Sequence, residues 1–302
     1  GATINVTPWL KQLVPDIYLY YVAGYGKISK TQSIGASLRY FSLGNITFTD
    51  IVGNTTGQFR PNEFALDLAY SQKLSETFSA GLAMRYVRSN LTGNYTLSNG
   101  QATKAGTSAN VDVGLYYQSK KLEINGKKSI ASAGLVFSNI GSKVSYSVQK
   151  DFIPMNLRLG AGLKMIIDDY NTFGFYGDLN KLLVPTPPIY LKSSTGNDSI
   201  NTSTQEKIIT AGKDPNVGIA KGILQSFNDA PGGGKEELKE INYSLGFEYW
   251  YAKTFAVRAG YFNEAKTKGN RKFFTAGIGL RYNVFGLDMA YLIPITQRNP
   301  LQ

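Results

Sequence analysis

Apolar and polar residues alternate along most of this chain with a period of two. In residues 33–40, Ile34, Ala36, Leu38 and Tyr40 share one face, and the residues between them share the other. Strict alternation is typical of a β-strand with one apolar face and one polar face. The pattern recurs in thirteen segments: 2–9, 17–27, 33–40, 63–71, 77–86, 109–117, 131–137, 155–165, 173–179, 241–251, 255–261, 274–282 and 285–293. We therefore predict an all-β protein with thirteen recognisable strands.

The connections between these segments alternate in length. Short ones follow the second, fourth, eighth, tenth and twelfth segments, at 27–31, 73–76, 168–171, 252–253 and 283–284. Longer ones lie between them, at 43–62, 89–107, 139–152 and 180–240. Bacterial outer-membrane barrels have short periplasmic turns, long outer loops and strands of about 10 residues. The rhythm predicts a transmembrane antiparallel β-barrel, with residues 1–302 as one domain and 180–240 as a long extracellular insertion.

The two faces of the predicted strands favour lipid on the apolar side. Tyrosines end the apolar rows at both rims, as in the aromatic belts of membrane proteins: Tyr40, Tyr86, Tyr261 and Tyr291 toward the long loops, and Tyr70, Tyr117, Tyr251 and Tyr282 toward the short turns. The opposite face carries mid-strand charges of both signs: Arg39, Asp67, Arg85, Asp112, Arg158, Lys164, Glu248, Arg258, Arg281 and Asp288. Such charges need water or partners, which a barrel interior supplies. We expect a largely filled interior braced by ion pairs rather than an ion-selective pore.

The strand count is odd, whereas bacterial barrels normally have an even number of strands. We therefore expect about fourteen strands. Either a last strand is absent from this chain, or one strand escapes the alternation pattern.

The connection at 180–240 has its own helical signal. Asp214 is a plausible N-cap, and Pro215 suits the first helical position. Val217, Ile219, Ala220, Ile223, Leu224 and Phe227 then recur at helical spacing. We expect Gly232–Gly234 to end this helix and residues 235–240 to form another helical turn. The helix either caps the barrel mouth or docks on a partner. The candidate partner-contact residues are Val217, Ile219, Ile223, Leu224 and Phe227.

Composition argues against an enzyme. The chain has no Cys and no His, so it lacks thiol nucleophiles, Ser-His-Asp triads and the commonest transition-metal ligands. The Gly-x-Gly fragments at 160–162 and 277–279 lie inside strands and open no helix, so neither is a phosphate loop. Asp168–Asp169 occupies a tight turn, where an acidic pair is usually solvated. We predict no catalytic residue, no cofactor and no metal site.

The net charge of +11 suits either nucleic acid or anionic lipid and lipopolysaccharide. The basic runs at 120–121 and 127–128 are short and lie in apparent turns. Scattered loop lysines therefore explain the charge best. We expect contact with outer-membrane lipid and lipopolysaccharide, and no nucleic-acid partner.

Long runs in the C-terminal third resemble one protein family. These runs are Ser226–Gly233, Glu236–Glu240, Tyr243–Tyr251, Arg258–Glu264 and Gly277–Tyr282. They resemble the PorV (LptO) family, outer-membrane components of the type IX secretion system of Bacteroidetes. The resemblance extends over residues 215–295 and is compatible with the rest of the chain.

The resemblance implies a FadL-like barrel of fourteen strands in the bacterial outer membrane, without known catalytic activity. It implies association with the translocon barrel SprA (Sov), and acceptance of cargo that bears a C-terminal secretion signal. The cargo is then handed to the surface sortase PorU, together with PorZ. Family members also have a segment before the first strand and a last strand beyond the end of this chain. The alternative function is a FadL-like channel that takes up hydrophobic small molecules.

Overall fold

The computed structural model describes residues 1–8, 16–50, 52–93, 96 and 100–295. Within this part of the chain, an antiparallel sheet of fourteen strands dominates the fold. Thirteen of the strands follow one another as neighbours: β1 (Ala2–Pro8), β2 (Ile17–Lys27), β3 (Gln32–Leu43), β6 (Asn62–Lys73), β7 (Phe78–Asn90), β8 (Gly106–Gln118), β10 (Lys127–Gly141), β11 (Asn156–Ile166), β12 (Asn171–Leu182), β15 (Ile241–Tyr251), β16 (Phe255–Asn263), β17 (Lys272–Tyr282) and β18 (Phe285–Pro294). The predicted all-β fold is confirmed, and each predicted segment overlaps one of these strands. The last residue of the segment predicted at 2–9 lies outside the described residues.

Short elements occupy the connections and were not predicted by the alternation. They are β4 (Ile46–Thr49), β5 (Thr55–Phe59), β9 (Leu122–Ile124), β13 (Ile189–Tyr190), β14 (Ile209–Ala211), α1 (Ile219–Gln225), α2 (Gly234–Lys239) and the 3₁₀ turn η1 (Lys266–Lys268). The strand β9 pairs with β10 and joins it through Asn125 and Gly126, which both have positive φ (50° and 72°). Such a two-residue turn matches the twist of the strands that it joins.

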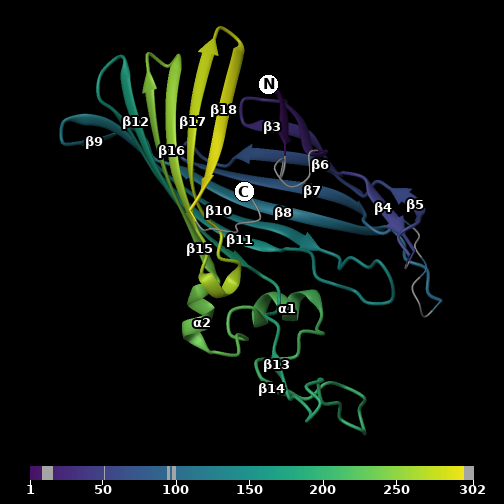
Figure 1. The fold of residues 1–302 in the computed structure, drawn as a ribbon. Helices are drawn as coiled ribbons and strands as arrows, with labels where there is room; N and C mark the ends of the chain where they lie inside the picture. The colour runs from purple at the N-terminus through teal and green to yellow at the C-terminus, as the bar shows by residue number, and fades with distance from the viewer. Residues whose placement is uncertain (9–15, 51, 94–95, 97–99, 296–302) are drawn as a thin grey trace.

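The main sheet curls strongly, and its two ends approach each other (Figure 1). Strands of L-residues twist with a fixed hand, so a sheet of this many strands tends to close on itself. Because the thirteen consecutive strands are antiparallel, β1 and β18 run in the same direction, and no pairing between them is present in the described residues. The result is a barrel-like sheet with the longest connection gathered at one end, at the bottom of Figure 1.

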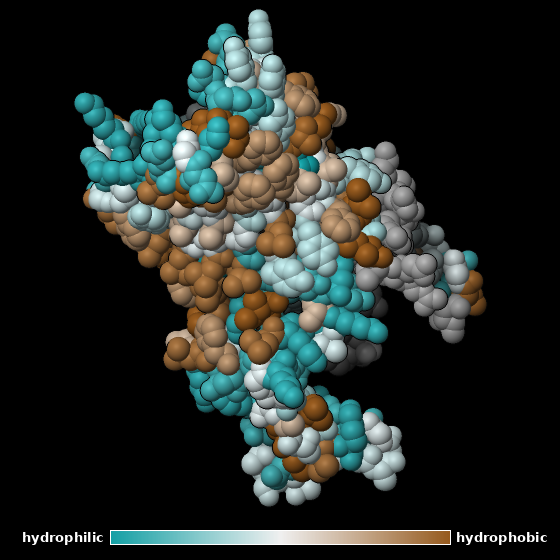
Figure 2. All heavy atoms as spheres, turned by 90° about the vertical axis from the view of Figure 1, so that its left-hand side faces the viewer, coloured by the Kyte–Doolittle hydropathy of each residue, from teal (hydrophilic) through white to brown (hydrophobic). Residues whose placement is uncertain are grey.

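The outer face of the sheet is apolar over its full width. The register places Leu38 opposite Leu66 and Leu66 opposite Tyr86, and at the other end Ile278 opposite Met289. Many such side chains are exposed, with Leu68 at 61% and Met289 at 61%. In Figure 2, apolar residues form a brown band across the wall between hydrophilic ends. A wall of this kind needs an apolar environment, because soluble monomers rarely expose large contiguous apolar patches.

Aromatic rings gather near the loop-side end of this wall. Tyr20 lies 6.4 Å from Tyr40, and Tyr243 lies 6.2 Å from Tyr261 between ring centroids. At the turn side, Tyr170 stacks on Tyr251 at 6.1 Å. Three of the eight predicted rim tyrosines, Tyr40, Tyr261 and Tyr251, thus stand beside another tyrosine ring. None of the helices in the described ranges is long and apolar enough to cross a membrane.

Candidate functional site

Residues 183–240 form an ordered unit at the loop-side end of the barrel, which we call the cap (Figure 1). It contains α1 and α2 next to the barrel mouth, and a lobe built on β13 and β14 farther out. Isolated bridges Lys192↔Asp198 and Ile200↔Lys207 extend that lobe. The cap begins with a backbone hydrogen bond from Leu183 N to Met155 O at 2.7 Å, and both residues are fully buried. The insertion is therefore anchored as soon as it leaves β12.

The helix α1 is shorter than predicted and has a different N-cap. The expected cap, Asp214, accepts a hydrogen bond from Asn216 N instead, and Val217 N bonds to Pro215 O. These local bonds bend the chain, so that helical geometry begins only after Gly218, the observed N-cap. The prediction that Gly232–Gly234 end this helix is also wrong, because α1 ends at Gln225 with Ser226 as its C-cap. The second helical turn exists as α2, which Gly234 begins.

The five predicted contact residues do not share one environment. Val217 is buried, with 9% exposure, and Ile219 and Ile223 are half-buried. Leu224 is 74% exposed and Phe227 is 47% exposed. On the inner side of α1, Gly222 lies so close to the ring of Phe152 that a Cβ there would approach it to 2.7 Å. The first three predicted residues therefore lie within or partly within the cap, and the last two face outward.

Two lysines from the barrel hold α2 in place. Lys181, near the end of β12, bonds Glu237 at 3.1 Å and Glu240 at 2.8 Å. Lys268, in the β16–β17 connection, bonds Glu236 at 2.7 Å and Glu240 at 2.8 Å. In each of these ion pairs the cap supplies the carboxylate and the barrel supplies the ammonium group. We call this arrangement the latch.

Burial makes the latch a strong local constraint. The side chains of Lys181, Glu237 and Glu240 are only 9%, 12% and 11% exposed. Burial by itself would raise the pKa of Glu240, but hydrogen bonds from Lys181, Lys268 and Thr186 outweigh it and hold that pKa below its ordinary value. The pKa of Glu236 is lowered by its hydrogen bond with Lys268 and by the backbone N–H of Gly232.

A buried carboxyl group lies beside the latch. Asp229 is 1% exposed and accepts a hydrogen bond from Thr186 N at 3.1 Å through Oδ2. Its other oxygen, Oδ1, has no hydrogen-bond partner among the residues that the structure describes. Burial raises the pKa of Asp229, and the nearby charge of Glu237 adds to the effect. The surroundings of Asp229 therefore favour its neutral form, whereas those of Glu236 and Glu240 favour the ionised form.

Sequence reasoning missed the latch lysines. Lys181 continues the outward row of β12 that contains apolar Leu179, and Lys268 lies in a short polar connection. The available signal was the acidic run at 236–240 in α2, which requires cations when it packs against a barrel rim.

Ion pairs also cross the inner face of the barrel, as predicted. Arg85 on β7 pairs with Asp67 on β6 and, at 3.1 Å, with Asp112 on β8. It also donates to Asn139, whose backbone N–H donates to Asp112 at 2.7 Å. Ser37 on β3 donates to Asp67 at 2.7 Å. One hydrogen-bonded network therefore ties β3, β6, β7, β8 and β10 together.

A second network joins the last strands. Arg258 on β16 bonds Glu248 at 2.6 Å and Asp288 on β18 at 2.7 Å, and Asp288 also bonds Arg281 at 2.7 Å. The Arg258–Asp288 bridge passes over β17 at Gly279, where a Cβ would come within 2.8 Å of the Arg258 guanidinium. Both guanidinium groups also lie about 5.3–5.4 Å from the ring centroid of Trp250. Of the predicted luminal charges, Arg158 and Lys164 are exposed and form no ion pair within the described residues.

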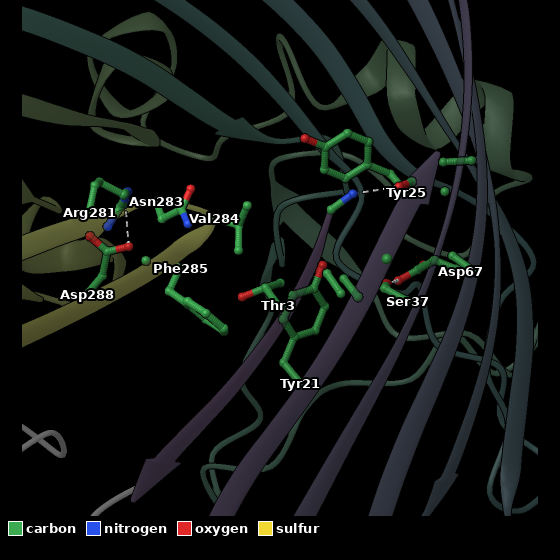
Figure 3. Close-up of a pocket in the computed structure, with 18 residues that line it drawn as sticks. Thr3, Tyr21, Tyr25, Ser37, Asp67, Arg281, Asn283, Val284, Phe285 and Asp288 are labelled. Carbon is green, nitrogen blue, oxygen red and sulfur yellow. Dashed lines mark hydrogen bonds and ion pairs between the residues drawn. The ribbon is translucent and has the colours of Figure 1, made fainter. Parts of the chain in front are cut away.

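A cavity of about 630 Å³ separates the two ends of the sheet on the inner side. Figure 3 shows its walls: Thr3, Tyr21, Tyr25, Ser37 and Asp67 on the first strands, and Arg281, Asn283, Val284, Phe285 and Asp288 on the last hairpin. In the part of the chain that the structure describes, no group of His, Cys, Asp or Glu side chains is arranged to hold a metal ion. The hydrogen bonds and ion pairs described above brace the strands of the barrel against one another and hold the cap on its rim.

Comparison with known proteins places the chain in a family. The model of the family described as "Type IX secretion system protein PorV" matches residues 1–189. This is well over half of the 302 residues. The chain belongs to the PorV family. A search of curated proteins found no match.

The PorV match confirms the family that the C-terminal runs resembled, but it does so over a different part of the chain. The matched residues extend from the N-terminus into β13. The runs that carried the resemblance begin at Ser226 and lie outside the matched range. PorV-family membership makes the chain a component of the type IX secretion system, and the family is not a known enzyme family.

Proposed function

We propose that this chain is an integral, non-enzymatic β-barrel of the bacterial outer membrane, built as one domain with the cap as an extracellular insertion. It associates with the translocon barrel SprA (Sov) and accepts cargo that bears a C-terminal secretion signal. It then hands the cargo to the sortase PorU, together with PorZ, at the cell surface. The PorV-family match supports the secretion role.

The membrane location rests on the contrast between the two faces of the sheet. Exposed apolar residues cover the outer face, such as Leu68 and Met289, whereas ion pairs such as Arg258–Asp288 lie on the inner face. In lipid, each backbone group needs an internal partner, and within the described sheet neighbouring strands provide one except along the outer edges of β1 and β18. Charges on the lipid side would be costly, and the inner face removes that cost.

The cap is the proposed partner-contact unit. The latch holds it rigidly, so that exposed side chains on it keep fixed positions, and binding requires less ordering of the surface. Leu224 and Phe227 are the proposed direct contacts, because large exposed apolar groups are common anchors at interfaces. Lys181 Nζ lies 5.7 Å from the centre of the Phe227 ring and helps to orient it. Val217, Ile219 and Ile223 support these contacts from within the cap.

Introducing negative charge at these two apolar residues tests this contact. The double variant Leu224→Asp and Phe227→Asp should lose co-purification of the translocon barrel in mild detergent, and secretion of cargo should fall. The matched control is Ile200→Asp, which changes a 55% exposed residue in the outer lobe of the same cap. Normal co-purification and normal secretion by the double variant would exclude these two residues as contacts.

One observation favours the alternative of a channel for hydrophobic small molecules. A groove of about 360 Å³ on the inner wall has Gly246 and Gly260 in its floor, with Tyr176 on one side and Phe262 and Phe273 on the other. The two phenylalanine rings stack at 4.8 Å. Aromatic walls and a glycine floor suit an apolar ligand. Native mass spectrometry of the detergent-purified protein tests this: a retained apolar small molecule supports the channel, and its absence contradicts it.

A further inference from the structure

The helix α2 has two faces of opposite character. Its inner face carries the three latch carboxylates: Glu236, Glu237 and Glu240. The other face carries the remaining long side chains: Lys235, Leu238 and Lys239. Helical spacing explains this separation, because the second set recurs at i, i+3 and i+4. All three of its members are exposed or half-exposed, and Leu238 reaches 70%. Among the described residues, neither Lys235 nor Lys239 forms an ion pair.

The position of α2 is fixed at the end of the apolar wall. The helix ends at Lys239, and β15 begins two residues later at Ile241. Tyr243, on the outer face of β15, stands beside Tyr261, and that ring lies 5.2 Å from Phe274. Since an extended chain spans at most about 3.6 Å per residue, Lys239 lies within about 14 Å of Tyr243. The C-terminal end of α2 therefore lies close to a ring of the loop-side aromatic belt.

We propose that the Lys235, Leu238 and Lys239 face of α2 is a membrane-surface contact, which binds the phosphate-bearing headgroups of the outer leaflet. This inference rests on the proposed outer-membrane location. Aromatic belts mark the headgroup level of a bilayer, so the two ammonium groups meet phosphate there. Leu238 enters the boundary between headgroups and acyl chains, as apolar residues of interfacial helices do.

Charge and packing favour lipid over bulk water at this face. Lysine side chains extend their apolar stems along hydrocarbon and leave the ammonium group among polar groups. The neighbouring β16–β17 connection, which Lys268 ties to α2, carries a further exposed cation, Lys266. The three glutamates of α2 are paired with the two latch lysines, which leaves the latch one net negative charge on the inner side, while the outward face carries two cations. The latch thus turns a helix of mixed charge into a cationic, partly apolar contact.

Single-cysteine labelling tests this inference, because the chain has no native Cys. Full-length Leu238→Cys protein is labelled with an environment-sensitive fluorophore and reconstituted into phosphatidylcholine vesicles, with or without phosphatidylglycerol. Quenching by lipids that carry a nitroxide on the acyl chain is measured. Leu68→Cys, at mid-height of the wall, is the lipid-exposed control, and Ile200→Cys, in the outer lobe, is the water-exposed control.

The expected result is that the Leu238→Cys label is quenched, and more so when phosphatidylglycerol is present. Adding Lys235→Ser and Lys239→Ser should abolish the increment due to phosphatidylglycerol, and these changes leave the latch intact. A Leu238→Cys label that behaves like the Ile200→Cys label, while Leu68→Cys is quenched, overturns the inference and leaves this face to water or a protein. An unquenched Leu68→Cys label overturns the membrane location itself, and the inference with it.

Discussion

Replacing Lys181 with methionine should open the cap without unfolding the barrel. Methionine keeps most of the apolar stem of the lysine and removes its ammonium group. Glu237 then loses its ion pair with Lys181, and Glu240 keeps its bonds to Lys268 and Thr186. Both carboxylates remain almost fully buried, at 12% and 11% exposure. A buried carboxylate without its cation favours the open cap, in which water solvates it.

The structure sets the size of this effect. Removing one partner of a buried ion pair costs about 3–5 kcal/mol. Because Glu240 retains two partners and Glu237 still accepts from Ala230 N at 2.8 Å, we expect the lower end, about 3 kcal/mol. At about 1.4 kcal/mol per factor of ten, opening of the cap becomes roughly 100-fold more frequent.

Hydrogen exchange measured by mass spectrometry reports this opening directly. Peptides that cover residues 228–241 should exchange faster in Lys181→Met, whereas peptides from β6 and β7 should not change. The control is Lys192→Met, which breaks an ion pair with Asp198 whose lysine is 63% exposed. Such a surface pair contributes at most about 1 kcal/mol. If Lys181→Met accelerates exchange at 228–241 no more than Lys192→Met does, the latch is not what holds the cap.

Three further predictions concern the faces of the barrel and the titration of the cap. Leu68→Arg should destabilise the barrel in vesicles by about 2–4 kcal/mol and Ala69→Arg by much less, because Leu68 lies on the exposed apolar face, which we propose contacts lipid, and Ala69 lines the inner cavity; equal urea-unfolding shifts would refute the face assignment. Because the pKa values of Glu236 and Glu240 are lowered, their stabilisation is present above the ordinary pKa of about 4.3 and is lost as pH falls through the lower folded-state values. The protection of the cap amides relative to their intrinsic exchange rate at each pH should therefore stay constant from neutral pH to about pH 5 and fall only in stronger acid. The raised pKa of Asp229 has the opposite sign, so Asp229→Asn should slow cap exchange at neutral pH, and this advantage should vanish below the ordinary Asp pKa of about 3.9.

The main sheet could be predicted because each strand carries its own signal. A strand with one apolar face and one polar face alternates whatever its neighbours are, so segments such as 241–251 are visible in isolation. The short strands β13 and β14 were not predicted, because two or three residues cannot show a period. The N-cap of α1 also escaped, because the bond of Asn216 N to Asp214 competes with a helix start and pattern alone does not decide between them.

The cap site could be predicted only in outline. The apolar periodicity of 217–227 indicates a helix, but it does not show which of its residues the cap buries. In the structure Val217 is buried, whereas Leu224 is exposed. The latch joins Lys181 to Glu240 across 59 positions in sequence. Pairings at that separation are decided by the path of the chain through space. A local pattern contains no information on that path.

The sequence separation of Lys181 and Glu240 also affects the entropy of forming the β12–β15 strand pair. Pairing of β12 with β15 starts at Lys181 and Ile241, so these strands meet only after the whole cap has been looped out. The entropy of closing a loop grows only with the logarithm of its length, about 0.6 kcal/mol per doubling. Closing this connection therefore costs only about 2 kcal/mol more than closing a turn of about four residues. A cap that folded first would hold its two ends, and with them β12 and β15, close together. For the same reason, the outer lobe can gain or lose residues at little cost to the barrel.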